Sequence, residues 1–381
     1  MKQRLFVTLS LAGLAMATFG ATKPKTAIKS LNKTTIQQPT YTEWHDLQVN
    51  AINRFPLHTN FFTYPADDWV SEKDGKIVSK DILHMNKTES KYFLSLDGTW
   101  KFYWVANADQ RPTDFYKEDL DDSKWKTMNV PGNWEMNGFG DPEYVNNGFA
   151  WREHFNEQPP AVPTKDNHVG SYRRIIDIPA NWDGKQVVAH FGSVTSNIYL
   201  YVNGKFAGYA EDSKVAAEFD ITPYLKKGKN LIAFQTFRWC DGSWDEDQDF
   251  WRLSGVARES YLFARDAKLH LEDVRVTPDL VNNYKDGVLN ISTKVKGTGK
   301  LNFILFDKEG KQVATATGLA KNGTANITMN VENPHKWNAE TPYLYTLQVS
   351  LSSALKNGNM KSASMTPVKV GFRKVEIKNK Q

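Results

Sequence analysis

The stretch QVVAHFGSVTSNIYLYVNGKFAGYAED, residues 186–212, decides the fold class. Within it, residues 198–202 alternate aliphatic side chains with tyrosines, which is the period of two that a β-strand imposes on its faces. Asn203 and Gly204 follow at once, and these residue types best tolerate the positive φ angles of a tight hairpin turn. The stretch therefore predicts a β-hairpin in an all-β domain.

Segments on both sides of the hairpin show the same short apolar runs separated by turn residues. Many short strands joined by turns are typical of a jelly-roll sandwich, which we expect to occupy residues 89–266. Further strands are predicted within residues 91–104, 230–239 and 258–265, and turns at Pro131-Gly132 and Asn137-Gly138.

A second all-β unit is predicted over residues 267–373. About a hundred residues of alternating strands fit an immunoglobulin-like β-sandwich. The usual disulfide of that fold is excluded because Cys240 is the only cysteine. No long helix is predicted, so the fold class is all-β. The expected strands of this unit lie within residues 289–295, 325–331, 343–351 and 367–372.

The composition is that of a globular protein rich in aromatic rings. The chain has 381 residues, of which 40% are hydrophobic, 24% charged and 13% aromatic, with 12 tryptophans. Such rings either fill large β cores or stack on a ligand, with sugars the favoured ligand, and both interpretations stay open. The net charge is +5, but the lysines are scattered and form no basic stripe, which argues against a nucleic acid as partner.

The N-terminus has the pattern of a secretory signal peptide over residues 1–21. Lys2 and Arg4 precede a short apolar run, and small residues follow it. The run is too short for a membrane span, so we expect export to a periplasm-like space and no membrane-spanning segment. We interpret residues 22–88 as a linker followed by an ordered arm, which lies on the first domain from about residue 44.

One segment concentrates acidic residues and tryptophans. WCDGSWDEDQDFWRLSG, residues 239–255, places five carboxylates among three tryptophans, a combination suited to a hydroxylated or cationic ligand. An EF-hand calcium loop is excluded because Phe250 stands where its glycine is needed and Val256 where its bidentate glutamate belongs. The sequence also lacks an H-E-x-x-H zinc motif, a G-x-S-x-G elbow and a phosphate-binding glycine loop.

Extended to RWCDGSWDEDQDFWRLSGVARE, residues 238–259, the segment resembles the signature of the first domain of large bacterial β-galactosidases in glycoside hydrolase family 2. The related β-glucuronidases share the sandwiches but, as a family, not the EDQDFWRLSG pattern, so the resemblance favours a β-galactosidase. It covers about residues 44–381. The other matching stretches, in the same order, are LDGTWKF (96–102), VPGNWEMNGFGDPEYVN (130–146), GSYRR (170–174), GYAEDSKVAAEFDIT (208–222), NPHKWNAETPYLY (333–345) and VGFRKVEI (370–377).

The resemblance implies an enzyme whose catalytic groups lie outside this chain. Family members are retaining glycosidases that hydrolyse terminal β-D-galactosyl residues with two glutamates on a (β/α)₈ TIM barrel, which follows the immunoglobulin-like domain. Residues 374–381 correspond to the start of the joint to that barrel. We therefore expect no barrel, no catalytic residue and no activity in the chain alone. Asn156 and Glu157 imitate the Asn-Glu pair around the family's acid, but they lie in a proline-flanked loop of the first domain.

Two other functions stay open at this point. The chain could be a stand-alone carbohydrate-binding or adhesion module, or part of another family 2 glycosidase such as a β-glucuronidase. The partners implied by the resemblance are a β-galactoside, the barrel portion of the same enzyme and, for the full-length enzyme, further copies of itself.

The resemblance also implies which residues contact the sugar. In the family, an Asp and an Asn of the first domain reach over the barrel mouth to galactosyl hydroxyls and a sodium ion. The Asp aligns with Asp249 and the Asn with Asn146, although Asn147 follows directly and could be the true contact. Sodium, held by Asp249 together with the barrel, and magnesium are the ions implied for the full-length enzyme, and we expect neither to be bound by this chain alone.

The remaining residues of the acidic segment have expected structural roles. Asp245, Glu246 and Asp247 could all serve only to shape or solvate the loop, and we favour this interpretation for Asp245. Trp251 and Arg252 are expected to anchor the loop in the sandwich rather than to contact sugar.

Overall fold

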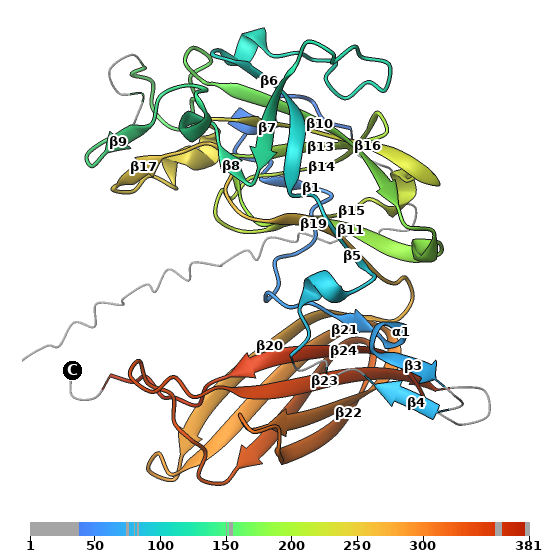
Figure 1. The fold of residues 1–381 in the computed structure, drawn as a ribbon. Coiled ribbons are helices and arrows are strands. Elements are labelled where there is room, and N and C mark those ends of the chain that lie inside the picture. The colour runs from blue at the N-terminus through green and yellow to red at the C-terminus, as the bar shows by residue number, and fades with distance from the viewer. Residues whose placement is uncertain are drawn as a thin grey trace, which may run out of the picture. The chain divides into compact units, whose positions relative to one another are not determined.

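The computed structural model describes residues 38–73, 76–79, 81, 84–149, 151, 155–354 and 360–377. The predicted signal peptide lies outside these residues. The described chain forms two β-sandwiches and an N-terminal arm that pairs with both (Figure 1). Among the described helices, none is both long and apolar enough to cross a membrane.

The first sandwich is built on a seven-stranded antiparallel sheet. The hairpin predicted from the sequence is confirmed, with Asn203 and Gly204 in its turn at φ angles of 49° and 76°. In order across the sheet, the strands are β1 (Ala51–Ile52), β14 (Lys205–Ala210), β13 (Ile198–Val202), β16 (Gly228–Phe237), β10 (Val169–Ile178), β6 (Gly98–Val105) and β7 (Lys126–Val130).

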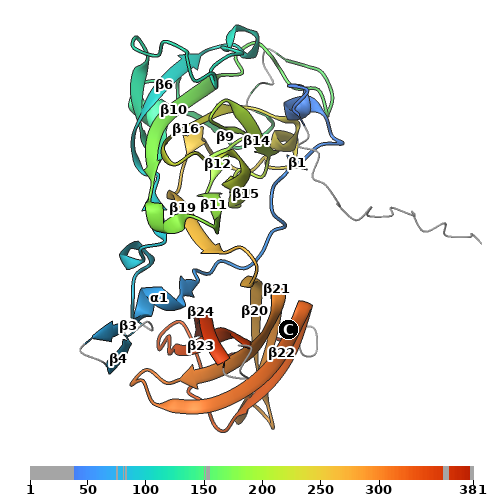
Figure 2. The ribbon, with the colours of Figure 1, turned by 90° about the vertical axis from the view of Figure 1, so that its right-hand side faces the viewer.

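A four-stranded sheet faces this larger one across a core of rings. Trp100, Tyr172 and Phe234 enter the core from the larger sheet, and Phe191 and Phe219 enter it from the smaller. In Figure 2, β6, β10 and β16 of the larger sheet run side by side. The smaller sheet has the order β15 (Ala217–Asp220), β11 (Lys185–Phe191), β19 (Ser260–Asp266) and β5 (Phe93–Ser95).

The outer face of the larger sheet is also buried. Tyr199 and Tyr201 of β13 point into a second cluster of rings there, which Trp44 of the arm and Trp151 of a loop help to cover. Leu200, between the two tyrosines, belongs to the core between the sheets. The alternation read from the sequence therefore separates two buried faces, and most of the aromatic residues fill these two cores.

Short strands and single-turn helices connect the sheets of the first sandwich. One small sheet contains β12 (Val194–Thr195), β18 (Gly255–Val256) and β8 (Gly132–Asn133), and a two-stranded ribbon contains β9 (Glu143–Val145) and β17 (Phe250–Arg252). The helical turns are η3 (Ala108–Gln110), η4 (Glu135–Asn137), η5 (Ala180–Trp182), η6 (Thr222–Tyr224) and η7 (Asp241–Trp244).

The second sandwich is made by long strands that serve both of its layers. The first half of β21 pairs with β20 and its second half with β23, while β22 follows it along both halves. β21 changes its partner from β20 to β23 around Gly297, whose φ of +86° allows a bend that other residue types resist. The strands are β20 (His270–Val281), β21 (Asp286–Phe306), β22 (Gln312–Val331), β23 (Tyr345–Ala354) and β24 (Met360–Val370).

The arm contributes an edge strand to each sandwich. β1 pairs with β14 of the first sandwich, as expected, but β2 (Tyr64–Pro65) pairs with β24 of the second. The arm therefore does not lie on the first domain alone. Its other elements are η1 (Glu43–His45), α1 (Ala66–Trp69), β3 (Val70–Lys73), β4 (Lys76–Ser79) and η2 (Lys87–Glu89).

Candidate functional site

The three candidate sugar contacts gather at one end of the β9–β17 ribbon. In this ribbon Phe250 pairs with Val145. Asp249 directly precedes Phe250, and Asn146 directly follows Val145, so antiparallel pairing brings them to the same end. Asn147 is the next residue along the chain. Figure 1 shows the ribbon at the left edge of the first sandwich.

The tip of the ribbon is open to solvent and carries its own hydrogen bond. Asp249, Asn146 and Asn147 are all exposed. The hydroxyl of Tyr144 donates a hydrogen bond to Oδ1 of Asp249, and this contact with a carboxylate raises the pKa of the tyrosine. The second oxygen of Asp249 is thus available to a ligand while the first fixes the orientation of the carboxylate.

Two aromatic rings flank the carboxylate at the tip. Trp251 is 55% exposed and Tyr144 53% exposed, and their ring centroids lie 5.6 Å apart. The expectation that Trp251 anchors the loop is therefore wrong. Successive side chains of a strand point to opposite faces, so Trp251 must point outward if Arg252 points inward.

Arg252 does point inward and anchors the ribbon at its base. Its side chain is 7% exposed and forms an ion pair with Asp247, and its guanidinium lies 4.5 Å from the ring centroid of Phe250. The other strand of the ribbon, β9, contains Glu143, and Oε1 of this glutamate lies 3.1 Å from Nη2 of Arg238. The two arginines thus fix one strand each, and the exposed tip stands on a rigid base.

The other acidic residues of the segment have different surroundings. Oε1 of Glu246 accepts a 2.7 Å hydrogen bond from the backbone N–H of Ser213, which ties the acidic loop to the neighbouring one. Asp247 is held by Arg252, whereas Asp245 is exposed. These positions agree with a loop-shaping role for Glu246 and Asp247 and a solvated one for Asp245.

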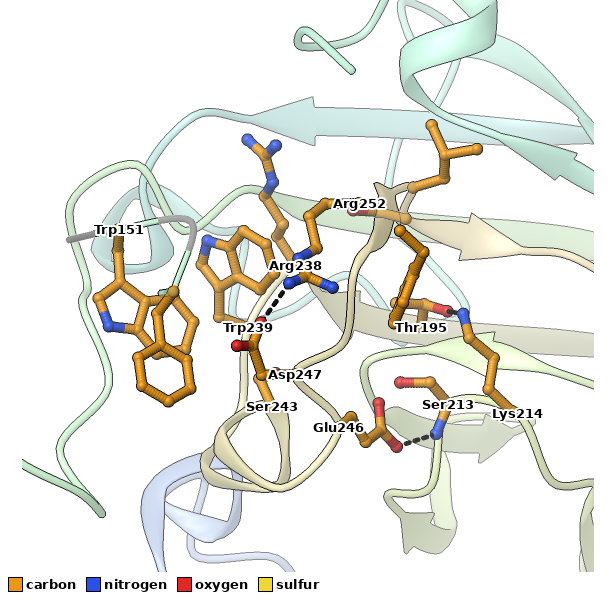
Figure 3. A pocket seen from close by; sticks show the side chains of 14 residues that line it. Trp151, Thr195, Ser213, Lys214, Arg238, Trp239, Ser243, Glu246, Asp247 and Arg252 are labelled. Carbon is orange, nitrogen blue, oxygen red and sulfur yellow. Dashed lines mark hydrogen bonds and ion pairs between the residues drawn. The ribbon is translucent and has the colours of Figure 1, made fainter. Parts of the chain in front are cut away.

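A small cavity lies beneath the ribbon (Figure 3). Its volume is about 40 Å³, and Trp239, Glu246, Asp247, Phe250 and Arg252 are among the residues that line it. Ligand pockets usually measure about 300–1,000 Å³, so this cavity accommodates a few water molecules but no sugar ring. This cavity is therefore too small to be the sugar site itself.

A second acidic cluster lies in the same sandwich, where the sequence predicted no site. Oxygen atoms of Glu211 and Asp241 and the sulfur of Cys240 lie within 4.8 Å of one another, and all three residues are buried. Burial raises the pKa of Glu211 to about 8 and raises the pKa of Asp241. The thiol of Cys240 has a pKa well above its ordinary value, again because of burial, so it stays protonated and suits a hard cation poorly.

The two carboxylates of this cluster do fit a divalent cation. Oδ2 of Asp241 is buried and accepts from no backbone N–H, amide or hydroxyl of the described residues, and the carboxyl group of Glu211 is the side-chain partner of Asp241. Gly242 leaves the space that the other carboxylate needs, because a Cβ there would lie 2.9 Å from Oε2 of Glu211. Close carboxylate oxygens are the ligands that magnesium prefers. This pair was missed because Glu211 and Asp241 are 30 positions apart in the sequence.

Tyr144 was also missed as part of the tip, although the sequence contained a signal. It precedes Asn146 by two positions, and residues two apart in an extended segment lie on the same face. The decoy pair Asn156 and Glu157 lies in an exposed loop without strand structure.

Both sandwiches match models of one protein family. Residues 93–266 match the model described as glycosyl hydrolases family 2, sugar binding domain. Residues 269–373 match the model described as glycosyl hydrolases family 2. The two matches follow each other along the chain and span nearly all strands of the two sandwiches.

Similar curated proteins are mostly named β-galactosidase and are much longer than this chain. A β-galactosidase of Priestia megaterium is 36% identical over 352 residues, which is 89% of this chain but 32% of that protein. The β-galactosidase large subunit of Leuconostoc lactis is 32% identical, with 88% of this chain and 52% of the subunit covered. The chain thus spans about a third to a half of the length of these relatives.

Solved structures share the fold at low sequence identity. A glycosyl hydrolase family 2 member from Bacteroides cellulosilyticus matches with a TM-score of 0.56 and 23% identity, covering 75% of this chain and 37% of that one. A β-glucuronidase from Bifidobacterium dentium matches with a TM-score of 0.60 and 19% identity, covering 75% and 49%. At these identities the likeness concerns the fold alone.

Proposed function

The chain belongs to glycosyl hydrolase family 2, and on this basis we propose that it is the N-terminal part of an exported β-galactosidase and supplies one wall of the galactose site. The hydrolysis itself would use two glutamates of a barrel outside this chain, in a retaining reaction. The chain contributes binding and orientation of the sugar, not catalytic groups.

One observation carries this proposal. Asp249 and Asn146 stand together at the exposed tip of a ribbon whose base is held by buried arginines, while the cavity beneath is too small for a sugar. A polar tip that is held in place but not enclosed by a pocket suits a surface that binds a sugar together with a second domain. A carboxylate accepts hydrogen bonds from sugar hydroxyls, and an amide both donates and accepts them.

The decisive experiment is Asp249→Asn in the full-length enzyme. The substitution removes the charge from a hydrogen-bonded ligand contact, so kcat/KM should fall roughly ten- to a hundredfold. The matched control is Asp245→Asn in the same loop, which should retain activity because Asp245 is exposed and solvated. Wild-type kcat/KM and sodium response in Asp249→Asn would refute the assignment of the tip to the sugar.

A second experiment tests the chain by itself. The purified chain should not hydrolyse an aryl β-galactoside, and activity should appear only when a matching barrel portion is supplied and docks. Turnover that survives rigorous purification would reveal a catalytic pair within the described sandwiches or the rest of the chain.

Two ions belong to this proposal as expectations from the family. Sodium would be held by Asp249 and by groups of the barrel, because the tip alone offers too few oxygen ligands. Magnesium would be held by Glu211 and Asp241, the buried carboxylates described above. When bound, either ion would supply a fixed positive charge that orients carboxylates.

A stand-alone carbohydrate-binding module is the second candidate, because Tyr144 and Trp251 are exposed as a pair of rings beside a carboxylate. Rings of this kind pack against the apolar faces of sugars. The two candidates differ in a simple titration. A stand-alone module quenches the fluorescence of Trp251 with galactosides in the isolated chain, whereas one wall of a larger site does so only with the barrel present.

Export to a periplasm-like space is also part of the proposal. It rests on the basic and apolar pattern of residues 1–21. Cell fractionation and N-terminal sequencing should find the mature protein outside the cytoplasm and shortened by about 17–21 residues at its N-terminus. Intact protein in the cytoplasm would overturn the assignment.

A further inference from the structure

The imidazole of His58 lies between two oxygen atoms that can only accept hydrogen bonds. Its Nδ1 is 2.6 Å from the carbonyl oxygen of Thr59, and its Nε2 is 2.8 Å from Oε2 of Glu218. A neutral imidazole has a single N–H group and can serve only one of them. Both hydrogen bonds therefore require the imidazolium form of His58.

Glu218 is the centre of this arrangement. Its other carboxylate oxygen, Oε1, lies 2.7 Å from Nδ1 of His190, and the glutamate is buried. Burial alone would raise the pKa of Glu218, but the hydrogen bonds from His190 and His58 outweigh it and lower the pKa to about 2. In return, the hydrogen bond to Glu218 raises the pKa of His58 against the opposing effect of burial.

His58 belongs to the part of the arm that crosses the first sandwich. Arg54 forms a 2.7 Å ion pair with Asp212, and the backbone N–H of Phe55 donates to the carbonyl oxygen of Glu218 over 2.8 Å. At the far end, the hydroxyl of Thr59 donates to Oδ1 of Asp273 over 2.7 Å. Residues 53–59, which we call the strap, are thus held mainly by polar contacts.

Apolar packing contributes little to holding the middle of the strap. Two cavities of about 280 and 200 Å³ border it, and residues 55–58 line both. Leu57, in the middle, is 52% exposed. A segment with cavities beside it and a half-exposed leucine depends on its hydrogen bonds and ion pairs to stay docked.

We propose that the strap is a pH-controlled latch, docked on the first sandwich while His58 is protonated and released when His58 loses its proton. The arm supplies an edge strand to each sandwich on either side of the strap, so release would loosen the segment between two fixed strands. This device acts independently of the sugar site.

Charged groups from several elements surround the latch. The acidic groups nearest to His58 are Glu218 of β15 and Asp273 of β20, and both favour its protonated form. From the sandwich side, His190 of β11 shares the carboxylate of Glu218, and Arg265 of β19 interacts with the same glutamate. Burial lowers the pKa of Arg265.

The cavity walls carry further charges of both signs. Lys214, Arg258 and Glu259 line the larger cavity, and Glu272 and Arg275 line the smaller one. Burial lowers the pKa of Lys214 from its ordinary value of 10.5.

The direction of the pH dependence follows from the two shifts. Since folding raises the pKa of His58, its contribution is complete below its ordinary value near 6.5 and is lost as the pH rises through the folded value. Since folding lowers the pKa of Glu218, its contribution is complete above the ordinary value of 4.5 and is lost as the pH falls toward 2. The strap is therefore most firmly docked between about pH 4.5 and 6.5.

The test is limited proteolysis of the full chain with subtilisin between pH 6 and 9, with protease activity normalised at each pH by a peptide substrate. Cleavage near Leu57 should accelerate by up to about tenfold per pH unit through the folded pKa of His58, because it tracks the undocked population. His58→Gln has no titrating group and should be cut at one rate throughout. His84→Gln, which removes an exposed histidine paired with Asp81, should keep the wild-type profile.

An NMR titration of histidine-labelled wild-type chain tests the same latch without any variant. The His58 ring should titrate above 6.5, and its titration should move down in Glu218→Gln. A wild-type His58 that titrates at or below 6.5 would overturn the proposal, as would a His58→Gln profile that still rises with pH like the wild type.

Discussion

The two sandwiches bury very different side chains. Among the described residues, the second sandwich buries mainly aliphatic groups and a few neutral or weakly polar ones, such as His270 and Thr366, with no buried carboxylate or arginine between residues 269 and 373. The first sandwich and the arm segments packed on it bury many charges. These include Glu135, Arg173, Glu211, Glu218, Arg238, Asp241 and Arg252.

The difference separates a supporting domain from a site-bearing one. A buried ion pair adds little net stability compared with apolar residues of the same size, and it is retained where it fixes a position. In the first sandwich these pairs lie under the ribbon that carries Asp249, and at Glu218 of β15, on which the strap docks. The second sandwich has no such task and packs as a plain aliphatic core. Three substitutions and a magnesium titration sharpen this contrast.

One of the two largest effects is expected from Arg238→Met, beneath the ribbon. The methionine fills similar space but leaves Glu143 without its arginine, so unfolding free energy should fall by about 3 kcal/mol, at the low end for buried pairs because Glu143 is partly exposed. Urea unfolding followed by tryptophan fluorescence measures it. In the second sandwich, Arg275→Met removes an arginine that is 67% exposed and should change stability by less than about 1 kcal/mol. Equal losses in both would erase the contrast.

A comparable loss should come from a cavity in the second sandwich. Leu347 is fully buried in its core, and Leu347→Ala should lower the free energy of unfolding by about 2–5 kcal/mol. Because the described residues of this sandwich bury no carboxylate, lysine or arginine, the loss should be the same at pH 5.5 and pH 8. Leu344→Ala, at a position 41% exposed, is the matched control and should cost much less. A strongly pH-dependent loss at Leu347 would contradict a purely apolar role.

A smaller effect is expected from magnesium at the buried acid pair. At a hundredfold excess over its dissociation constant, a bound ion stabilises by about 2.7 kcal/mol, which thermal unfolding with magnesium or EDTA detects as a shift in Tm. Glu211→Gln and Asp241→Asn should each abolish the shift. Glu246→Gln, an acidic residue bonded to a backbone N–H instead, should retain it. A shift that survives in Glu211→Gln would place the ion elsewhere.

The smallest effect is expected from Tyr144→Phe at the tip of the ribbon. Only the hydroxyl that donates to Asp249 is lost, and the ring remains beside Trp251. The exposed position means that stability should stay unchanged. In the full-length enzyme, kcat/KM should fall about two- to tenfold through looser orientation of the carboxylate. An unchanged kcat/KM would mean that Asp249 is held by other groups.

Local patterns predicted most of the fold. The β13–β14 hairpin was predictable because both its alternation and its turn lie within a dozen residues. The bend of β21 at Gly297 was not, because a continuous strand pattern does not reveal where its partners change. The pairing of β2 with β24 was equally hidden, since two residues are too short to show any periodicity.

The sequence allowed the polar residues at the tip of the ribbon to be selected, but not the residues around them. The motif alignment selected Asp249 and Asn146, and the strand register indeed brings them to one end. The outward direction of Trp251 followed from the inward anchoring of Arg252, which the sequence alone does not specify. Glu211 approaches Asp241 only through the folded sheet, so no spacing rule could pair them.

The edge strand β2 has a consequence for how the protein is made. Tyr64 pairs with Met365, about 300 residues further along the chain, so this early segment stays unpaired until the ribosome has made the strand that it pairs with. The second sandwich cannot close this edge before β24 emerges, and closing so long a loop adds an entropic cost late in folding. A shortened protein that starts at residue 267 would lack Tyr64, which packs against Met365. Its β24 would then be an open sheet edge, which is prone to pair with other chains.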